Sequence, residues 1–177
     1  MNGVVLISGN GSNLQSIIDN AKSIDLNICC VVSNKMDAFG LKRAAKAGIP
    51  CVALDETLFD SKLGFDQEIM KVIDNYQAEV IILAGYMRIL SADFISKYSG
   101  KILNIHPSLL PKFPGLNTHQ RAIDASEKKH GASVHFVTEE VDGGPVIAQQ
   151  SVNIDSTDNP QTLAKKVLEK EHVLYPQ

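Results

Sequence analysis

The chain has 177 residues and a mass of 19.2 kDa, with 44% hydrophobic residues, 21% charged residues and a net charge of −3. This length and balance are typical of one folded domain and exclude extensive disorder. The slightly acidic charge gives no reason to expect nucleic acid or an anionic membrane as the main partner, so an anionic ligand must be held by a local site.

The cysteines and the N-terminal residues indicate the compartment. Cys29, Cys30 and Cys51 show no CxxC spacing and include an adjacent pair that cannot easily bridge to itself. The apolar run Val4–Ile7 is shorter than the ~7–15 residues of a signal-peptide core. No run approaches the ~18 residues of a membrane span. We therefore expect a reduced, cytoplasmic protein.

Short apolar runs alternate with amphipathic segments through the first part of the chain, the pattern of strands that alternate with helices. In chain order, it predicts strand Val4–Ser8, helix Leu14–Lys22, strand Leu26–Ser33, helix Ala38–Ala47, strand Cys51–Leu54, helix Phe59–Tyr76, strand Val80–Ala84, helix Ser91–Tyr98 and strand Lys101–His106. Such alternation predicts a Rossmann-like α/β fold, an open, mostly parallel twisted sheet with helices on both faces, whose ligands gather where the strands end.

The rhythm changes towards the C-terminus. The predicted elements there are helix Ala122–Ser126, strands Ala132–Val137 and Val146–Ile154, and a last helix that ends near Leu174. The two strands are separated by the turn-rich EEVDGGP, which predicts a C-terminal antiparallel hairpin. Asp158 or Asn159 is expected to cap the last helix, with Pro160 in its first turn. Since no repeat or linker interrupts the chain, we expect a single domain over residues 1–177.

The sequence GNGSN, Gly9–Asn13, lies between the first predicted strand and the first predicted helix. Backbone N–H groups and the positive end of the helix can bind a phosphate there, and Ser12 or Asn13 is expected to cap the helix. Leu14 stands where the third glycine of a dinucleotide fingerprint would be, and the loop lacks the lysine of a P-loop. Spacing alone leaves both an anion site and a plain capped turn open.

Asn104 and His106 lie two residues apart at the end of an apolar strand, so their side chains project to the same face. Pro107 then ends the strand. A histidine exchanges a proton near neutral pH, with an unperturbed pKa of ~6.5, and an asparagine amide can donate to a developing oxyanion. The pair suits acyl transfer, and a polar cap on a strand end is the alternative.

Asp142, in VDGGP, is the candidate for a third group that orients the imidazole, as in many transfer sites. The alternative is an aspartate that only forms the turn with its two glycines. Among the other histidines, we expect His130, His135 and His172 to be structural or solvated. His119 is the exception, because it follows the proline-rich loop.

The segment GYMRIL, Gly85–Leu90, follows the fourth predicted strand and combines apolar side chains with one arginine. Ordinary core lining is one interpretation. The other is the wall of a pocket for a flat aromatic ligand, since such pockets are mostly apolar with a few polar groups.

Several stretches together resemble one family, the phosphoribosylglycinamide formyltransferases, which are folate-dependent enzymes of purine biosynthesis. They are ISGNGSNLQ, SNK.DAFGL, LAGYMRILS, LNIHPSLLPKFPGL and HGASVHFVTEEVDGGPVIAQ, and they span residues 7–149. The wider formyltransferase and deformylase group shares the asparagine, the histidine and the distal aspartate. The combination of GSNLQ with PGL.TH separates this family from those relatives.

The resemblance implies transfer of a formyl group from 10-formyltetrahydrofolate, as co-substrate, to the primary amine of glycinamide ribonucleotide. It implies that Asn104, His106 and Asp142 are catalytic. The N-terminal half would bind the ribonucleotide phosphate, and the C-terminal half would bind folate and carry the catalysis.

The other binding residues follow from the same resemblance. The set implied for the ribonucleotide is Gly11, Ser12, Asn13, Leu14, Gln15, Lys170 and Glu171. The set implied for folate is Lys62, Met87, Arg88, Ile89, Leu90, Asn104, Thr138, Glu139, Glu140, Val141 and Asp142. The resemblance implies no metal and only small-molecule substrates, with no nucleic acid and no membrane as partner. The sequence leaves the oligomeric state open.

The chain departs from the family pattern at two places. Asn117 stands where many members have histidine, and relatives continue past EHVLYP with a further helix and a short strand. The ribonucleotide site around Lys170 and Glu171 is therefore expected to be incomplete or mobile, with lower stability or activity if the further segments cover the core.

Other functions are considered beside the transferase. A formyltetrahydrofolate hydrolase or another amine formyltransferase of the same fold is the nearest alternative, and a non-catalytic binder of folate or nucleotide is a third. A nicotinamide dehydrogenase is disfavoured, because Asn34 and Lys35 follow the second strand where an acidic ribose-binding residue is needed.

Overall fold

The computed structural model describes every residue from Met1 to Gln177 and divides into two compact units, Met1–Leu103 and Asn104–Gln177. Its strands follow one another in the order β3-β2-β1-β4-β5-β6-β7 in one seven-stranded sheet. The pairs among β1 to β4 are parallel, and β6 and β7 are antiparallel. The predicted fold class is confirmed. None of the helices combines the length and the apolar character that crossing a membrane requires.

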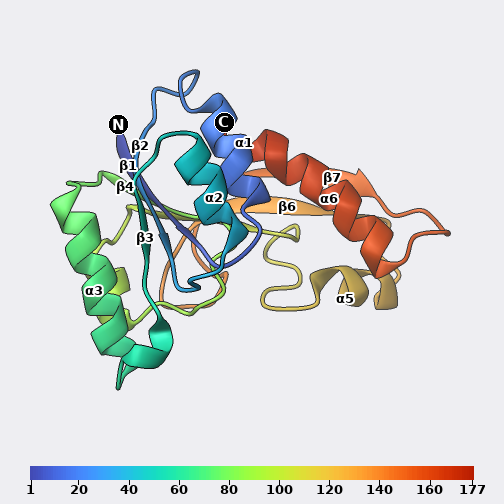
Figure 1. Cartoon of the computed structure of the whole chain (residues 1–177). Coiled ribbons are helices and arrows are strands. Elements are labelled where there is room, and N and C mark those ends of the chain that lie inside the picture. Colours follow the sequence, from blue (N-terminus) through green and yellow to red (C-terminus); the bar gives the residue numbers. More distant parts are fainter. The chain divides into compact units, whose positions relative to one another are not determined.

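The first unit (Figure 1) contains four strands and four helices before β5 (Ile102–His106), in which the boundary between the units falls. In chain order these are β1 Asn2–Ile7, α1 Ser12–Asn20, β2 Asn27–Ser33, α2 Phe39–Lys46, β3 Cys51–Ala53, a 3₁₀ turn at Glu56–Leu58, α3 Lys62–Asn75, β4 Val80–Leu83 and α4 Ala92–Lys97. All the predicted strands and helices of this part are therefore present, with ends that differ by a few residues.

The core of the first unit forms around β1. Val4, Val5, Leu6 and Ile7 are completely buried, as expected for a strand covered on both faces. Figure 1 shows α3 on the opposite side of the parallel strands from α1 and α2. This agrees with the strand order, because right-handed crossovers put α1 and α2 on one face and α3 and α4 on the other. Helices α1 and α2 contact each other, as do α3 and α4. The loops that leave the carboxyl ends of β1 and β4 are thereby held at the same edge of the sheet.

The first helix begins differently from the prediction. Gly11, not Ser12 or Asn13, is its N-cap, and no side chain caps the helix. Gly11 has a φ of 74°, in the left-handed region that favours glycine, and its carbonyl accepts the first helical hydrogen bond from Gln15 N at 2.9 Å. The prediction of a side-chain cap is wrong because the glycine makes the turn one residue earlier.

Two further helices begin elsewhere than predicted. A 3₁₀ turn precedes α3, which starts at Lys62 after the N-cap Ser61 rather than at Phe59. Helix α5 runs over Thr118–Asp124 and so begins four residues before Ala122. Its N-cap Asn117 has a left-handed backbone with a φ of 57°, a conformation that asparagine tolerates better than most residues.

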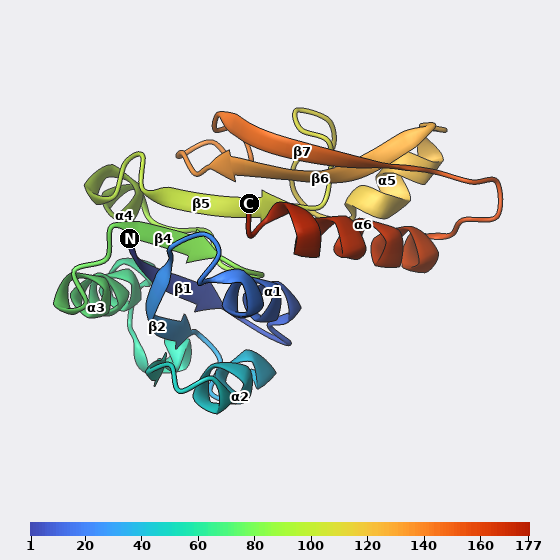
Figure 2. The same cartoon turned by 90° about the horizontal axis from the view of Figure 1, so that it is seen from above.

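The second unit contains the last residues of β5, followed by α5, β6 Lys129–Phe136, β7 Val146–Asn153 and α6 Pro160–Leu174. Strands β6 and β7 form the predicted hairpin, with Ala132 opposite Gln150. Helix α6 packs against both strands and lies along them in Figure 2. Residues Gly131–His135 are buried, whereas β7 is largely exposed. The hairpin therefore carries the chain from a buried strand into the turn that contains Asp142.

The last helix has the predicted capped start. The Asn159 side chain accepts hydrogen bonds from Gln161 N and Thr162 N, at 3.0 and 2.9 Å. The Thr162 hydroxyl accepts from Asn159 N at 2.9 Å, which completes a capping box.

We expect Asn159→Ala to lower the free energy of unfolding by about 1 kcal/mol, because it leaves two helix N–H groups without their acceptor. Urea unfolding followed by circular dichroism measures the change. Gln161→Ala is the control, since Gln161 contributes only its backbone N–H to the cap. An equal loss in both variants would contradict the role of the cap.

Candidate active site

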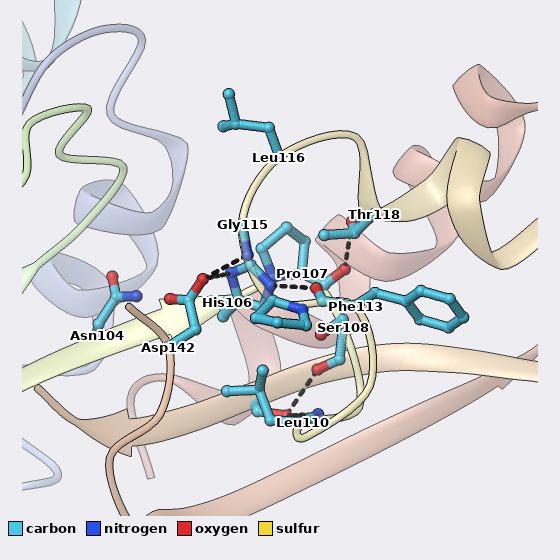
Figure 3. A network of polar contacts seen from close by, with 12 residues as sticks. Asn104, His106, Pro107, Ser108, Leu110, Phe113, Gly115, Leu116, Thr118 and Asp142 are labelled. Atoms are coloured by element: carbon cyan, nitrogen blue, oxygen red, sulfur yellow. Dashed lines mark hydrogen bonds and ion pairs between the residues drawn. The ribbon is translucent and has the colours of Figure 1, made fainter. Parts of the chain in front are cut away.

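His106 ends β5 in the second unit and is 6% exposed (Figure 3). Its Nδ1 lies 3.3 Å from Asp142 Oδ2, and its Nε2 lies 2.9 Å from the carbonyl oxygen of Phe113. Both ring nitrogens therefore face acceptor oxygens. An imidazole ring with protons on both nitrogens can donate to both oxygens at once.

Asp142 lies in the turn between β6 and β7 with a φ of 52°, in the left-handed region. The backbone N–H of Gly115 donates to its Oδ2 at 2.8 Å, and that same oxygen faces His106. Burial raises the pKa of the Asp142 carboxyl. The contacts with His135, Gly115 and His106 lower it by more, so the pKa lies below its ordinary value and the group is a carboxylate at neutral pH.

His135, a residue that the sequence predicts to be structural or solvated, completes the cluster. Its Nδ1 lies 2.8 Å from the carbonyl oxygen of Phe136. Its Nε2 lies 3.1 Å from Asn104 Nδ2 and 3.6 Å from Asp142 Oδ1. The Asn104 amide group carries two hydrogens and at most one of them can point to His135, so the other can be donated elsewhere.

The structure therefore brings together the three residues that the resemblance assigns to catalysis. Asp142 lies between Asn104 and His106 in Figure 3. Asn104 contacts His135 and His106 contacts Asp142, and these two partners contact each other, which agrees with the prediction that Asn104 and His106 share a face of the strand. The signal for His135 in the sequence is its place on the strand that leads directly to Asp142, but alternation alone does not say which face it occupies.

Two further histidines adjoin His106. The rings of His119 and His130 meet edge to face with centroids 5.2 Å apart, and His130 is 1% exposed. Burial, together with the nearby His119 and His106, lowers the pKa of His130 to about 4. Burial and His106 also lower the pKa of His119. Both rings are therefore neutral at pH 7, next to the histidine that has a carboxylate partner.

The loop after β1 forms the second candidate site, in the first unit. The residues that line a hollow of about 210 Å³ there are Ser8, Gly9, Asn10, Gly11, Ser12, Asn13, Ala84, Gly85 and Met87. The position combines backbone N–H groups with the start of α1, as an anion site requires. The loop is also joined to the one after β4, because Met87 N donates to the Ser8 hydroxyl at 2.8 Å.

Helix α2 holds this loop in place. A Cβ on Gly11 would meet Gly40 Cα at 2.7 Å, so the loop and the helix touch backbone to backbone. Gly40 N donates to Gly9 O at 3.0 Å. Arg43 donates from Nε to Asn10 O and from Nη2 to Asn10 Oδ1, each at 2.9 Å, and from Nη1 to Gln15 Oε1 at 3.4 Å. Arg43 therefore places a positive charge next to this loop, which lacks the lysine of a P-loop.

The loop after β4 carries four of the residues implied for folate. Met87 and Ile89 are 75% and 66% exposed, whereas Leu90 is buried. The guanidinium of Arg88 pairs with Glu56 and lies 3.9 Å from Asp66. Lys62 Nζ donates to Leu90 O at 3.1 Å.

The remaining implied residues lie in the second unit. Thr138–Val141 belong to the turn between β6 and β7, where Gly143 N donates to Glu140 O at 3.1 Å. Lys170 and Glu171 lie on α6, with Glu171 8% exposed. No group of three or more histidine, cysteine or acidic side chains has the arrangement of a metal site.

The pKa of His130 predicts a pH-dependent stability. The folded state holds His130 neutral down to about pH 4, whereas the unfolded chain protonates it below about pH 6.5. Its folded pKa is lowered, so the unfolded state binds more protons in this range and acid destabilises the fold. Between pH 7 and pH 5 this one group is expected to remove about 2 kcal/mol of stability.

Urea unfolding of the native chain and of His130→Gln at both pH values measures the effect. The loss between pH 7 and pH 5 should be about 2 kcal/mol smaller in the variant. An equal loss in the two proteins would show that His130 titrates normally.

The sequence of this chain is similar to those of known proteins over its whole length. Residues 1–177 match the family described as formyl transferase. The chain is 53% identical over 178 residues to the phosphoribosylglycinamide formyltransferase of Escherichia coli strain K12, covering 99% of this chain and 84% of that protein. It is 42% identical over 174 residues to the human trifunctional purine biosynthetic protein adenosine-3, covering 97% of this chain and 17% of that protein.

Solved structures agree with these similarities. The phosphoribosylglycinamide formyltransferase of Coxiella burnetii in complex with CHES has a TM-score of 0.95 and 48% identity, with 99% of this chain and 83% of that chain covered. The glycinamide ribonucleotide transformylase 1 of Symbiobacterium toebii has a TM-score of 0.96 and 38% identity, with 99% and 84% covered.

Proposed function

Because this chain belongs to the formyl transferase family, we propose that it transfers the formyl group of 10-formyltetrahydrofolate to the primary amine of glycinamide ribonucleotide, in de novo purine biosynthesis. The observation that carries the proposal is the contact between His106 Nδ1 and Asp142 Oδ2 at 3.3 Å. This buried pair lies at the end of β5 with the Asn104 amide beside the same cluster. Such a set of donors and one carboxylate suits acyl transfer to an amine.

In the first step, the site must stabilise negative charge. When the amine nitrogen bonds to the formyl carbon, the carbonyl oxygen becomes an oxyanion. The free amide hydrogen of Asn104 and an N–H of His106 donate to it. The His106 Nε2–H is held by the Phe113 carbonyl, a neutral acceptor, and an oxyanion is a stronger acceptor for that proton. The Asp142 carboxylate lies against the other ring nitrogen, Nδ1, and so orients the imidazole.

The second step moves one proton. The attacking nitrogen must lose a proton, and the folate nitrogen must gain one as its bond to the formyl carbon breaks. Asp142 is a carboxylate at neutral pH, so it can take the proton and return it, directly or through a water molecule. Atoms and charge balance without a metal ion or an oxidant.

The two substrates would use the two kinds of binding residue described above. Gly11–Gln15 would hold the phosphate of the ribonucleotide, with Arg43 behind the loop as the nearby positive charge. In the second unit, Lys170 and Glu171 are the residues that the resemblance implies for the ribonucleotide, and those of the turn before Asp142 are implied for folate. The exposed apolar side chains of Met87 and Ile89, in the first unit, fit the flat ring of folate.

The function is tested by incubating the purified chain with 10-formyltetrahydrofolate, with and without glycinamide ribonucleotide, and following the tetrahydrofolate product by absorbance. Product is expected only when the ribonucleotide is present. Equal product without it would favour a formyltetrahydrofolate hydrolase. A folded protein that forms no product would be a binder of folate or nucleotide.

The catalytic residues are tested by His106→Ala and Asp142→Asn. We expect each to lower kcat by roughly 10²–10⁴-fold, because one removes a donor to the oxyanion and the other removes the carboxylate that orients that donor and relays the proton. For His106→Ala, KM is expected to stay within about threefold, because His106 is not among the residues implied to bind either substrate. The control is Asp124→Asn, an exposed carboxylate on α5 that contacts Gln120. Near-normal turnover in either site variant would remove that residue from the mechanism.

A further inference from the structure

The guanidinium of Arg88 is directed into the first unit and not left free for a ligand. It pairs with Glu56, lies 3.9 Å from Asp66 and stands 4.3 Å from the centroid of the Phe65 ring. Its side chain is 18% exposed. Two carboxylates and an aromatic face already surround the positive charge, so it has little attraction left for the acidic groups of a substrate.

Asp66 is completely buried, and both of its partners belong to the loop after β4. Its Oδ2 accepts a hydrogen bond from Ser91 N at 2.7 Å, and its Oδ1 faces Arg88. A buried carboxylate is unfavourable unless it is hydrogen-bonded or paired, and both contacts that satisfy Asp66 are with this loop. Asp66 therefore ties α3 to the loop at residues 88 and 91.

Helix α3 supplies a third contact one turn before Asp66. Lys62 Nζ donates to Leu90 O at 3.1 Å, so residues 62, 65 and 66 of one helix all hold the same loop. Met87 and Ile89 alternate with the held residues and are exposed. The helix thereby fixes the backbone and leaves those two apolar side chains turned outward.

Glu56, in the 3₁₀ turn before α3, also holds the loop after β4. It pairs with Lys35 at 2.5 Å, accepts from Asn34 Nδ2 at 3.5 Å and pairs with Arg88. The hydrogen bonds with Lys35 and Arg88 lower the pKa of Glu56 to about 2, so it is ionised at every pH at which the protein would be assayed. Asn34 in turn accepts from the Ser8 hydroxyl, which accepts from Met87 N.

We propose that Glu56 and Asp66 are positioning residues for the formyl-folate substrate: they hold Arg88 and Ser91 and thereby set the backbone of Met87–Leu90. This inference rests on the proposed function for the identity of the substrate. Arg88 then acts through the chain and not as a direct ligand. Neither carboxylate touches the reacting atoms, so their loss weakens folate binding and leaves the chemical step nearly intact.

The test is steady-state kinetics of Glu56→Gln and Asp66→Asn. Both substitutions keep the side-chain volume and remove the charge, and the amide oxygen introduced by Asp66→Asn can still accept from Ser91 N. We expect KM for 10-formyltetrahydrofolate to rise about tenfold, with kcat and KM for the ribonucleotide within about twofold of the native values. Glu56→Asp keeps the charge and should recover part of the loss.

Two matched controls separate positioning from general damage. Lys35→Gln removes the other cation on Glu56 but leaves Arg88 paired. Glu68→Gln removes a carboxylate of the same helix that pairs only with Lys71. Both should keep the native KM for folate. An unchanged KM in Glu56→Gln, or a loss of kcat with KM intact, would overturn the proposal. Since Glu56 is partly exposed, this variant gives a result even if Asp66→Asn does not fold.

A second measurement is independent of activity. Amide hydrogen exchange of the segment Met87–Ser91 should be faster in Glu56→Gln than in the native chain and in both controls, because the ties that protect the loop are loosened. Unchanged exchange would overturn the positioning role. If the native chain forms no formyl product but the exchange result holds, the proposed function fails and the loop contacts stand.

Discussion

The carboxylate of Asp142 joins three segments that are distant in the chain. It receives a hydrogen bond from Gly115 in the proline-rich loop, faces His106 at the end of β5 and lies beside His135 on β6. A left-handed turn puts it there, supported by glycines that follow it. Burial opposes the negative charge of Asp142, and these contacts favour it. The site therefore forms only when all three segments are in place.

The histidines near that carboxylate differ in their surroundings. His106 contacts Asp142 through Nδ1, whereas His119 and His130 are buried close to His106 and have lowered pKa values. His119 and His130 are therefore neutral at pH 7, and of the three only His106 contacts Asp142. Burial and the neighbouring histidines account for the lowered pKa values, since all three are the same residue type.

The strand pattern and the short motifs of the sequence predicted much of this molecule. Apolar runs gave the parallel strands, and the spacing of Asn104 and His106 gave a shared face, because both follow from periodicity. Helix starts were less predictable: Gly11 and Asn117 cap through left-handed backbone conformations, which residue preferences do not reveal. The part of His135 and the pairing of Arg88 depend on which distant segments meet, and no local pattern contains that information.

The two hydrogen bonds of the Ser8 hydroxyl limit which residues can replace Ser8. It donates its one hydrogen to Asn34 and accepts from Met87 N, so the ends of β1, β2 and β4 meet at a single oxygen. Alanine would supply neither bond, and threonine would add a methyl group beside the hollow that Ser8 lines. Cysteine would lengthen both contacts. This oxygen is therefore a shared attachment point for the loop implied for the ribonucleotide and the loop implied for folate. We expect substitutions there to change the spacing of the two loops together.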